Sequence, residues 1–475
     1  MGKRSVEAGI DKLEKRLGRE KVVSDPAIVR LYAREPSGLR GDAWAVVFPE
    51  SEEDVRVLAR MAYEYEIPVY PQGSTTSLSG NTVPQGGIVV SFERMNRILE
   101  VNIVDSNAIV EPGVRIDDLN EELEKHGYMF PVDPASSAVA TVGGAINNGA
   151  GGLRGAKYGT MRDWVLGLNL VLVDEDASLI RVGCRTVKCR QGLDLTRLVV
   201  GSEGTLGLVT QAILRITPLP EDTVYALAFF DSLDDLVEAF VEIRRSGLNP
   251  FMLEFMDSRT VDYAARNLEL PYTPRGDMLL VGVEVNREAA ERVLSSLVSL
   301  LRKHGAREIV TAHGTEEARS KELFTVRKNL FTGQAGLTME KVGPGKRIMV
   351  LIEDIVVPPS RVPEAVRRIR ILEKKYGFTT FLGGHIGDGN LHPAVGFAAD
   401  DSDARRRVEE WFREVMRIAV ELGGSVSAEH GIGVLKREGL RYELEARNSL
   451  KALDIMREIK RAFDPKGLLN PGKIF

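Results

Sequence analysis

A long stretch of the chain without a charged side chain runs from Pro134 to Leu153. Its 20 residues match the length of a transmembrane helix. However, five glycines and two asparagines interrupt the stretch, and glycine weakens a helix because it leaves the backbone conformationally free. We therefore expect this segment to form ligand-binding loops and not a membrane span.

The composition is that of a globular protein. The chain has 475 residues, with 43% hydrophobic and 28% charged side chains, and this length predicts two or three domains. With 63 Lys and Arg against 68 Asp and Glu, the formal net charge is −5, which argues against nucleic acid as a partner. The two cysteines, Cys184 and Cys189, are too few for a disulfide framework, so we expect reduced thiols in a cytosolic protein.

The N-terminal residues are charged throughout and lack the apolar stretch of a signal peptide. We therefore expect a cytoplasmic protein without a transmembrane segment. Peripheral contact with the inner face of the membrane is left open by the sequence.

Hydrophobic patterns predict an alternation of strands and helices. Strands are expected at 45–48, 68–70, 88–91 and 108–111, with a helix from Ser51 to about Glu64. The segments 167–173 and 179–182 flank Asp174-Glu175-Asp176 and predict a hairpin. Prolines at 218 and 220 mark a domain boundary, after which strands at 226–230, 278–284 and 349–356 alternate with helices. This spacing predicts a second, α+β domain with a largely antiparallel sheet.

Two glycine-rich segments have the composition of phosphate- or cofactor-binding loops. The first, PQGSTTSLSG at 71–80, follows a predicted strand and offers hydroxyls and backbone N–H groups to an anion. The second, at 133–160, has glycines that let the backbone approach a flat ligand. A plain surface turn explains either loop alone, but the pair favours a large cofactor. The chain contains no GxGxxG fingerprint of a dinucleotide fold.

In order and spacing these loops, together with VKCRQGLDLTRLVVGSEGTLGLVTQAILRITPLP, resemble the motifs of the vanillyl-alcohol-oxidase/p-cresol-methylhydroxylase-type FAD-binding domain. The chain from about Asp25 to Phe475 is similar to the FAD-linked D-2-hydroxyacid dehydrogenases: D-lactate dehydrogenase, glycolate oxidase catalytic subunit and D-2-hydroxyglutarate dehydrogenase. This resemblance implies an α+β protein with two α/β subdomains in the FAD-binding domain and an α+β cap. We expect the FAD-binding domain at 1–220, the substrate or cap domain at 221–420, and a C-terminal segment at 421–475 that returns to the FAD domain.

The resemblance also assigns residues to the flavin. The family's first loop cradles the FAD pyrophosphate, the second surrounds the ribityl chain and isoalloxazine, and a third segment borders the adenine. Because some members tether FAD through a histidine in the first loop and residues 71–80 contain none, the FAD is expected to be non-covalent. The family motif usually has a glycine where Ser74-Thr75-Thr76 stands here. The cofactor-binding residues implied are Pro71, Gln72, Gly73, Ser74, Thr75, Thr76, Ser77, Pro134, Ser136, Thr141, Gly143, Gly144, Asn147, Gly151, Tyr158, Gly159, Glu203, Gly207 and Val209.

Half of the six histidines fall in one window of the sequence. If Asp388-Gly389 forms a two-residue turn, His385 and His392 face each other with Cβ atoms roughly 4.5–5.5 Å apart. Two imidazoles so placed suit one divalent metal, and a stacked or hydrogen-bonded pair is the alternative. Glu429 and His430 are adjacent, so one side chain can bind a metal while the other faces a substrate.

The family's motifs HIGDGNLH and AEHGIG divide these roles. Their match implies His385, His392 and Glu429 as ligands of Zn²⁺, with Mn²⁺ as the alternative, and His430 as catalytic base. Arg327 matches the arginine that holds the substrate carboxylate, although a solvated helix arginine explains it equally well. Ala394 stands where D-2-hydroxyglutarate dehydrogenases carry an asparagine, which counts against a second substrate carboxylate.

The sequence therefore predicts an enzyme that oxidises a small D-2-hydroxy acid, such as D-lactate, to the 2-oxo acid. Hydride would pass to flavin N5, and electrons would go to a protein or quinone acceptor other than NAD. Two alternatives stay open: a non-catalytic flavin subunit for electron transfer or partner binding, and an alkyl-dihydroxyacetonephosphate-synthase-like flavoenzyme. The oligomeric state is open, and a homodimer is compatible with the sequence.

Overall fold

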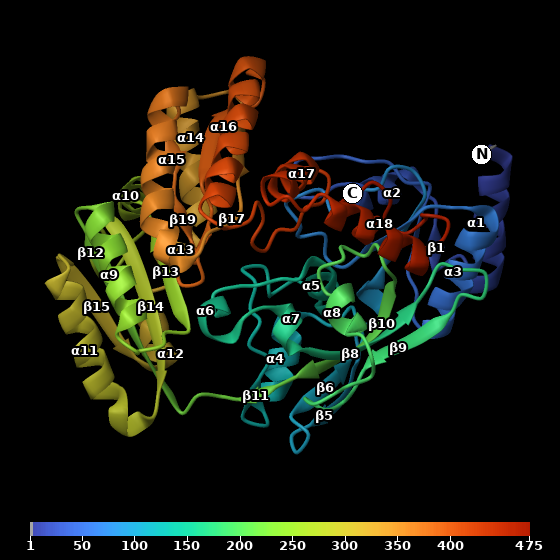
Figure 1. The fold of residues 1–475 in the computed structure, drawn as a ribbon, viewed down its shortest axis with the longest axis horizontal. Helices are drawn as coiled ribbons and strands as arrows, with labels where there is room; N and C mark the ends of the chain where they lie inside the picture. Colours follow the sequence, from blue (N-terminus) through green and yellow to red (C-terminus); the bar gives the residue numbers. More distant parts are fainter. Residues whose placement is uncertain (1–2) are drawn as a thin grey trace. The chain divides into compact units, whose positions relative to one another are not determined.

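A computed structural model describes residues 3–475 and divides the chain into two compact units (Figure 1). The first unit consists of Met1–Gly152, Gly159–Leu219 and Glu429–Phe475. The second consists of Leu153–Tyr158 and Pro220–Ala428. The sequence predicts domain boundaries after residues 220 and 420. It places the short segment Leu153–Tyr158 in the FAD-binding domain, whereas the structure assigns it to the second unit.

The first unit contains a four-stranded sheet in the order β1-β2-β4-β3. The strands β2, β3 and β4 are parallel, whereas β1 is antiparallel to β2. Between β2 and β3 runs helix α3, which starts where the acidic cluster predicted it: the Ser51 side chain accepts a hydrogen bond from Asp54 N. The bounds are β1 (Val22–Val23), β2 (Ala45–Val47), α3 (Glu52–Tyr65), β3 (Val69–Gln72) and β4 (Ile88–Ser91).

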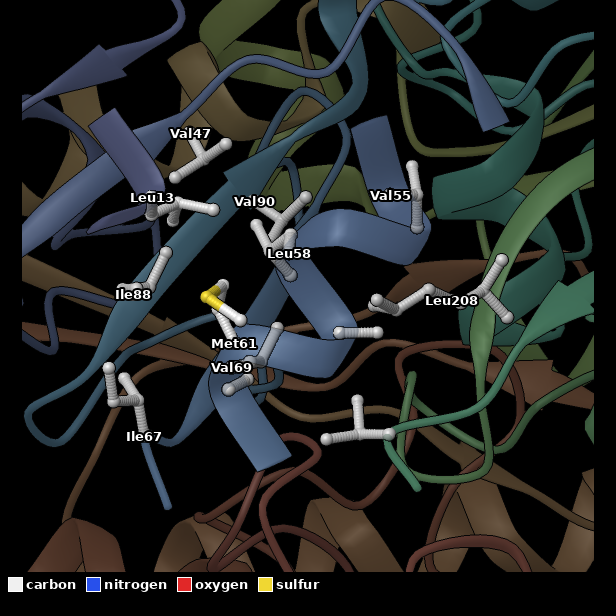
Figure 2. Packing of buried hydrophobic residues seen from close by; sticks show 14 of the residues in the cluster. Leu13, Val47, Val55, Leu58, Met61, Ile67, Val69, Ile88, Val90 and Leu208 are labelled. Carbon is white, nitrogen blue, oxygen red and sulfur yellow. The ribbon is translucent and has the colours of Figure 1, made fainter. Parts of the chain in front are cut away.

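The core of this sheet forms where α3 lies on it. Figure 2 shows side chains of α3, among them Leu58 and Met61, gathered with Val69 and Val90 of the sheet. Leu58 has no exposed surface. The packing fixes β3, whose carboxyl end leads directly into the first glycine-rich loop, as is usual for ligand loops in parallel sheets.

A second, antiparallel sheet completes the central part of the first unit, in the order β5-β6-β10-β8-β9. The predicted hairpin is confirmed: β8 pairs with β9, and Asp174–Asp176 lies between them. Helix α5 lies between β6 and β8 in the sequence. The bounds are β5 (Ile98–Asn102), β6 (Asn107–Val110), α4 (Ile116–Glu124), α5 (Val142–Asn148), β8 (Val165–Val171), β9 (Leu179–Gly183), α8 (Leu195–Val199) and β10 (Leu208–Arg215).

The loop between β9 and α8 corrects one expectation. Cys184 and Cys189 form a disulfide, with Cα atoms 5.9 Å apart, so the prediction of reduced thiols is wrong for this structure. The two cysteines are five residues apart, and the loop brings their Cα atoms within the range that a disulfide spans.

The C-terminal residues return to the first sheet. Leu469 forms a parallel bridge with Val69, and Asn470 N donates to Val69 O at 2.7 Å. The buried Lys473 ammonium donates to Val83 O at 2.9 Å. The bounds of the preceding helices are α17 (Arg437–Ala446) and α18 (Lys451–Phe463).

The second unit is built on a five-stranded sheet in the order β15-β12-β14-β13-β19. All of its pairings are antiparallel, which confirms the predicted sheet type. Alternate residues of β12, such as Tyr225 and Leu227, pack with Val261 of α10. The bounds are β12 (Asp222–Phe230), α9 (Leu233–Arg245), β13 (Met252–Met256), α10 (Ser258–Asn267), β14 (Asp277–Val285), α11 (Ala290–Lys303), β15 (Glu308–His313), α12 (Gly314–Ser320), α13 (Thr325–Lys328), α14 (Leu330–Val342) and β19 (Gly383–Gly384).

The strand predicted at 349–356 is split in two. Its first part, β16, pairs with β21, whereas its second part, β17, pairs with β20. At the break, Glu353-Asp354, the Asp354 carboxylate accepts hydrogen bonds from backbone and side-chain groups, which are described below. The bounds are β16 (Ile348–Ile352), β17 (Ile355–Val356), α15 (Val362–Tyr376), β18 (Thr380–Phe381), β20 (Asn390–Leu391), β21 (Ala394–Ala398) and α16 (Ser402–Glu421). None of the helices in the described part of the chain combines the length and apolar character that a bilayer crossing requires.

The core of the first unit yields a test of the packing. We expect Leu58→Ala to lower the free energy of unfolding by about 2–5 kcal/mol, because it leaves a cavity between α3 and the sheet. The control is Leu193→Ala, at a leucine that is 88% exposed and should change stability by less than about 0.5 kcal/mol. Urea unfolding measures both, and equal losses would contradict the packing described.

Candidate functional site

The first unit contains a cavity of about 230 Å³ whose walls come from both glycine-rich loops. A smaller adjoining hollow shares several of these residues and is also bordered by Gln72, Gly143 and Val209. The sequence therefore identified two loops that the fold brings together. The other predicted flavin residues on the cavity wall are Pro71, Gly73, Ser74, Thr75, Thr76, Ser77, Pro134, Ser136, Thr141, Gly144, Asn147 and Glu203.

The first loop is shaped by close contact and by a left-handed residue. A Cβ atom on Gly73 would lie 2.2 Å from Thr141 Oγ1, so only glycine lets the two loops approach. Thr75 has φ +52°, a conformation that β-branched residues rarely adopt. The chain thus takes a backbone conformation typical of glycine at a place where the related motif has glycine.

The second loop starts the short helix α5 at the cavity. Thr141 caps this helix, because its Oγ1 accepts a hydrogen bond from Gly144 N at 3.2 Å. A Cβ atom on Gly143 would lie 2.6 Å from Pro112 Cβ. Gly143 and Gly144 therefore allow the start of α5 to pack between Pro112 and the first loop.

Three asparagines on the cavity wall have buried polar atoms without a protein partner among the described residues. They are Asn81 Nδ2, Asn147 Oδ1 and Asn148 Oδ1. Buried polar atoms are normally hydrogen-bonded, and FAD offers both donors and acceptors, so the residues fit this cofactor. Sequence reasoning missed Asn81 and Asn148, although one directly follows the first motif and the other follows Asn147.

Glu203 joins this cavity to the loop that follows the predicted base. Its Oε1 accepts from Ile432 N at 2.6 Å and its Oε2 from Gly433 N at 2.9 Å. Burial raises the pKa of the Glu203 carboxyl to about 7, although the two N–H groups oppose this shift. Glu203 itself has φ +54°, so two residues on the cavity wall hold strained backbone.

Glu429 and His430 both line the same cavity. Asn148 Nδ2 donates a hydrogen bond to Glu429 O. A Cβ atom on Gly151 would lie 3.2 Å from Glu429 Oε2, so this glycine leaves room for the glutamate. The structure therefore brings the predicted base to the predicted flavin cavity within one unit.

Four predicted flavin residues do not border the cavity. Gly151 contacts Glu429, Gly159 lies against the Asp163 side chain, and Gly207 lies against Leu170. Tyr158 belongs to the second unit, where its hydroxyl donates to Glu284 Oε2 at 2.7 Å. Burial, with this bond, raises the pKa of the tyrosine. Contacts of these four residues with flavin stay predictions.

The histidine pair lies in the second unit and corrects the predicted register. His392 N donates to Gly383 O, and Asn390 N donates to His385 O, so His392 lies opposite Gly383 and not opposite His385. The turn therefore spans four residues, 386–389. The imidazoles of His385 and His392 nevertheless meet edge to face, with ring centroids 5.4 Å apart, because diagonal neighbours across two strands are within reach.

A buried carboxylate connects His385 to Arg327. Glu254, on β13, has no exposed surface. Its Oε1 lies 2.7 Å from His385 Nδ1, and its Oε2 accepts from Arg327 Nε at 2.8 Å. Arg327 is therefore not the solvated surface arginine of the alternative interpretation: its side chain is only 14% exposed.

A second buried carboxylate, Asp354, lies beside His392. Its Oδ1 is 3.8 Å from His392 Nδ1 and accepts from Asn390 Nδ2 at 2.8 Å. Its Oδ2 accepts from Ser427 Oγ at 3.0 Å and from Ala428 N at 2.9 Å. Asp354 thus ties β20, the strand that ends one residue before His392, to the residues that immediately precede Glu429.

Sequence reasoning missed Glu254 and Asp354. The sequence could have indicated both, because each acid interrupts a run of apolar residues. Glu254 interrupts FMLEFM, and Asp354 lies within IMVLIEDIVV. A charged residue inside a buried strand needs a partner, so such an acid marks a site even when its partner is unknown.

Comparison with known proteins identifies the family of the chain. A family model described as FAD linked oxidases, C-terminal domain, matches residues 219–474. The chain belongs to this FAD-linked oxidase family. A second model, described as FAD binding domain, matches residues 43–183, which include both glycine-rich loops.

Relatives and solved structures extend the match over the chain. It is 37% identical to the glycolate oxidase subunit GlcD of Bacillus subtilis, over 91% of this chain and 88% of that protein. It is 36% identical to a D-lactate dehydrogenase of Archaeoglobus fulgidus, over 91% of each. The structure of p-cresol methylhydroxylase with substrate bound is similar in fold, with a TM-score of 0.76 and 18% identity, over 100% of this chain and 97% of that one. This member of the FAD-linked oxidase family therefore has the expected p-cresol-methylhydroxylase-type fold.

The raised pKa of Glu203 predicts pH-dependent stability. The carboxyl has an ordinary pKa of 4.5 in the unfolded chain and a pKa of about 7 in the folded chain, so the folded chain binds more protons between these values. The stability contributed by the protonated group is therefore lost as the pH rises through this window. The charged neighbours Lys473 and Glu35 oppose each other in their effect on this pKa.

We expect Glu203→Gln to remove this part of the pH dependence, because an amide does not titrate. Urea unfolding of the FAD-free protein at pH 5 and pH 7.5 measures it. The wild type should lose roughly 2–4 kcal/mol more of its free energy of unfolding than the variant between these pH values. Parallel pH profiles would contradict the assignment.

Proposed function

We propose that the protein oxidises a D-2-hydroxy acid, such as D-lactate, to the 2-oxo acid with non-covalent FAD, and passes electrons to an acceptor other than NAD. The observation that carries this proposal is that His430 lines the cavity formed by the glycine-rich loops. At this position His430 would be available as a base where flavin and substrate meet. The named activities of the relatives, a glycolate oxidase subunit and a D-lactate dehydrogenase, support the same substrate class.

Bound FAD would supply the two-electron acceptor for the hydride of the substrate Cα. His430 would take the hydroxyl proton, since imidazole, with a reference pKa of about 6.5, is the side chain best suited to act as a base at neutral pH. Arg327 would bind the substrate carboxylate, because a guanidinium offers paired donors in a plane. Binding of the carboxylate would orient the Cα–H bond, which is a positioning effect.

His385, His392 and Glu429 would hold a divalent metal, Zn²⁺ or Mn²⁺, which supplies Lewis-acid stabilisation of the developing alkoxide. Two imidazoles and a carboxylate are suitable donors for such an ion. Glu429 is covalently next to Ala428, which is hydrogen-bonded to the carboxylate beside His392. The backbone next to Glu429, the third proposed ligand, is therefore held in place by Asp354.

Ala394 bears on the number of carboxylates that the substrate carries. This residue begins β21 and is fully buried, and its methyl group offers no hydrogen-bond donor. A second carboxylate on the substrate would find no polar side chain at this position. We therefore propose a monocarboxylic 2-hydroxy acid, and not a dicarboxylic one.

The proposed base yields a direct test against a non-catalytic flavin subunit. We expect His430→Gln to lower D-lactate-dependent dye reduction by about 10²–10⁴-fold, the usual contribution of general base catalysis. The FAD absorbance of the purified variant should be retained. The matched control is His126→Ala, at a surface histidine near the end of α4, which should leave turnover unchanged. Unchanged turnover in His430→Gln would remove this residue as the base.

A further inference from the structure

The strand β13 carries one acid among apolar residues. All five residues from Met252 to Met256 are buried, and Glu254 is the only charged one. Taking a carboxylate out of water is costly unless it is paired and hydrogen-bonded. An apolar side chain would fill this position in the strand without that cost, so the acid needs a role other than packing.

Glu254 has one partner for each carboxylate oxygen. One oxygen lies 2.7 Å from His385 Nδ1, and the other accepts from Arg327 Nε at 2.8 Å. We propose that Glu254 is a positioning residue that orients His385 towards a divalent metal and Arg327 towards the substrate carboxylate. This inference rests on the proposed function, because it concerns the same metal and the same carboxylate.

The contact with His385 selects one tautomer. A carboxylate only accepts hydrogen bonds, so the proton of the neutral imidazole lies on Nδ1. The lone pair is then on Nε2, the atom through which this tautomer would bind a metal. Carboxylate–histidine pairs of this kind orient metal ligands and raise their basicity.

The contact with Arg327 selects one edge of the guanidinium. With Nε bonded to Glu254, a carboxylate can no longer bind side-on through Nε and one Nη. Among the described residues the structure gives neither Nη atom a protein partner. The end-on edge, formed by Nη1 and Nη2, is therefore the one presented to a substrate.

A glutamine at position 254 separates this role from a structural one. The glutamine oxygen can accept from only one neighbour, and its NH₂ group must face the other. Arg327 has no acceptor, so the oxygen goes to Arg327 and the NH₂ donates to His385 Nδ1. The imidazole proton then moves to Nε2, and His385 can no longer bind a metal through that atom. The shape of the side chain is almost unchanged.

The experiment measures Zn²⁺ affinity in FAD-loaded protein, by competition with a chromophoric chelator. We expect Glu254→Gln to weaken Zn²⁺ binding by about 10–100-fold, with unchanged FAD content and an unfolding midpoint close to that of the wild type. The matched control is Asp277→Asn, at a buried acid on the neighbouring strand β14 that accepts from Ser258 N. This control should bind Zn²⁺ like the wild type.

The outcomes separate the inference from the proposed function. A wild type that binds Zn²⁺ together with a Glu254→Gln variant that binds it equally well would overturn the role of Glu254 alone. A wild type that binds no Zn²⁺ would overturn the proposed metal site, and the inference with it. Equal weakening in Asp277→Asn would show a general effect of removing a buried acid and would also overturn the inference.

A second variant covers the case in which Glu254→Gln does not fold. Glu254→Asp keeps the negative charge but withdraws the carboxylate by about one C–C bond, 1.5 Å. The shorter side chain cannot reach both partners, so we expect Zn²⁺ binding weaker than in the wild type. Wild-type affinity in Glu254→Asp would overturn the inference.

Discussion

The buried carboxylate of Glu203 connects three segments of the first unit that are far apart in the sequence. It lines the cavity of the glycine-rich loops and accepts from the N–H groups of Ile432 and Gly433. The backbone carbonyl oxygen of Glu203 accepts a hydrogen bond from Asn470 Nδ2. A buried carboxyl group needs such hydrogen-bond partners. Glu203 therefore helps to hold the loop that begins two residues after His430, and Asn148 holds the residue before His430.

The second unit applies the same principle to its imidazoles. Glu254 and Asp354 have no exposed surface, and each lies beside Nδ1 of one histidine. Apolar residues in these two positions would avoid the desolvation of a charge. Glu254 instead orients His385, and Asp354 holds Asn390, two residues before His392. In each unit, buried carboxyl groups thus hydrogen-bond to residues at or near the proposed catalytic and metal-binding positions.

Local patterns in the sequence predicted local structure well. The helix after Ser51 and the hairpin at Asp174–Asp176 follow from capping and turn residues, and both are confirmed. The turn at Asp388-Gly389 was predicted two residues too tight, because the backbone pairing depends on Gly383 and on neighbouring strands. The contacts of Glu203 with Ile432 and of Glu254 with Arg327 join distant segments. No spacing in the sequence shows them.

The central claim is that a D-2-hydroxy acid delivers its hydride to flavin in this protein. The most direct measurement is anaerobic mixing of the FAD-loaded protein with a panel of monocarboxylic 2-hydroxy acids, each as D and L enantiomers, while the flavin absorbance is followed. The account predicts that at least one D enantiomer, D-lactate first, bleaches the flavin and that its L enantiomer does not. Flavin that stays oxidised with every D acid, or is reduced equally by both enantiomers, would contradict the account.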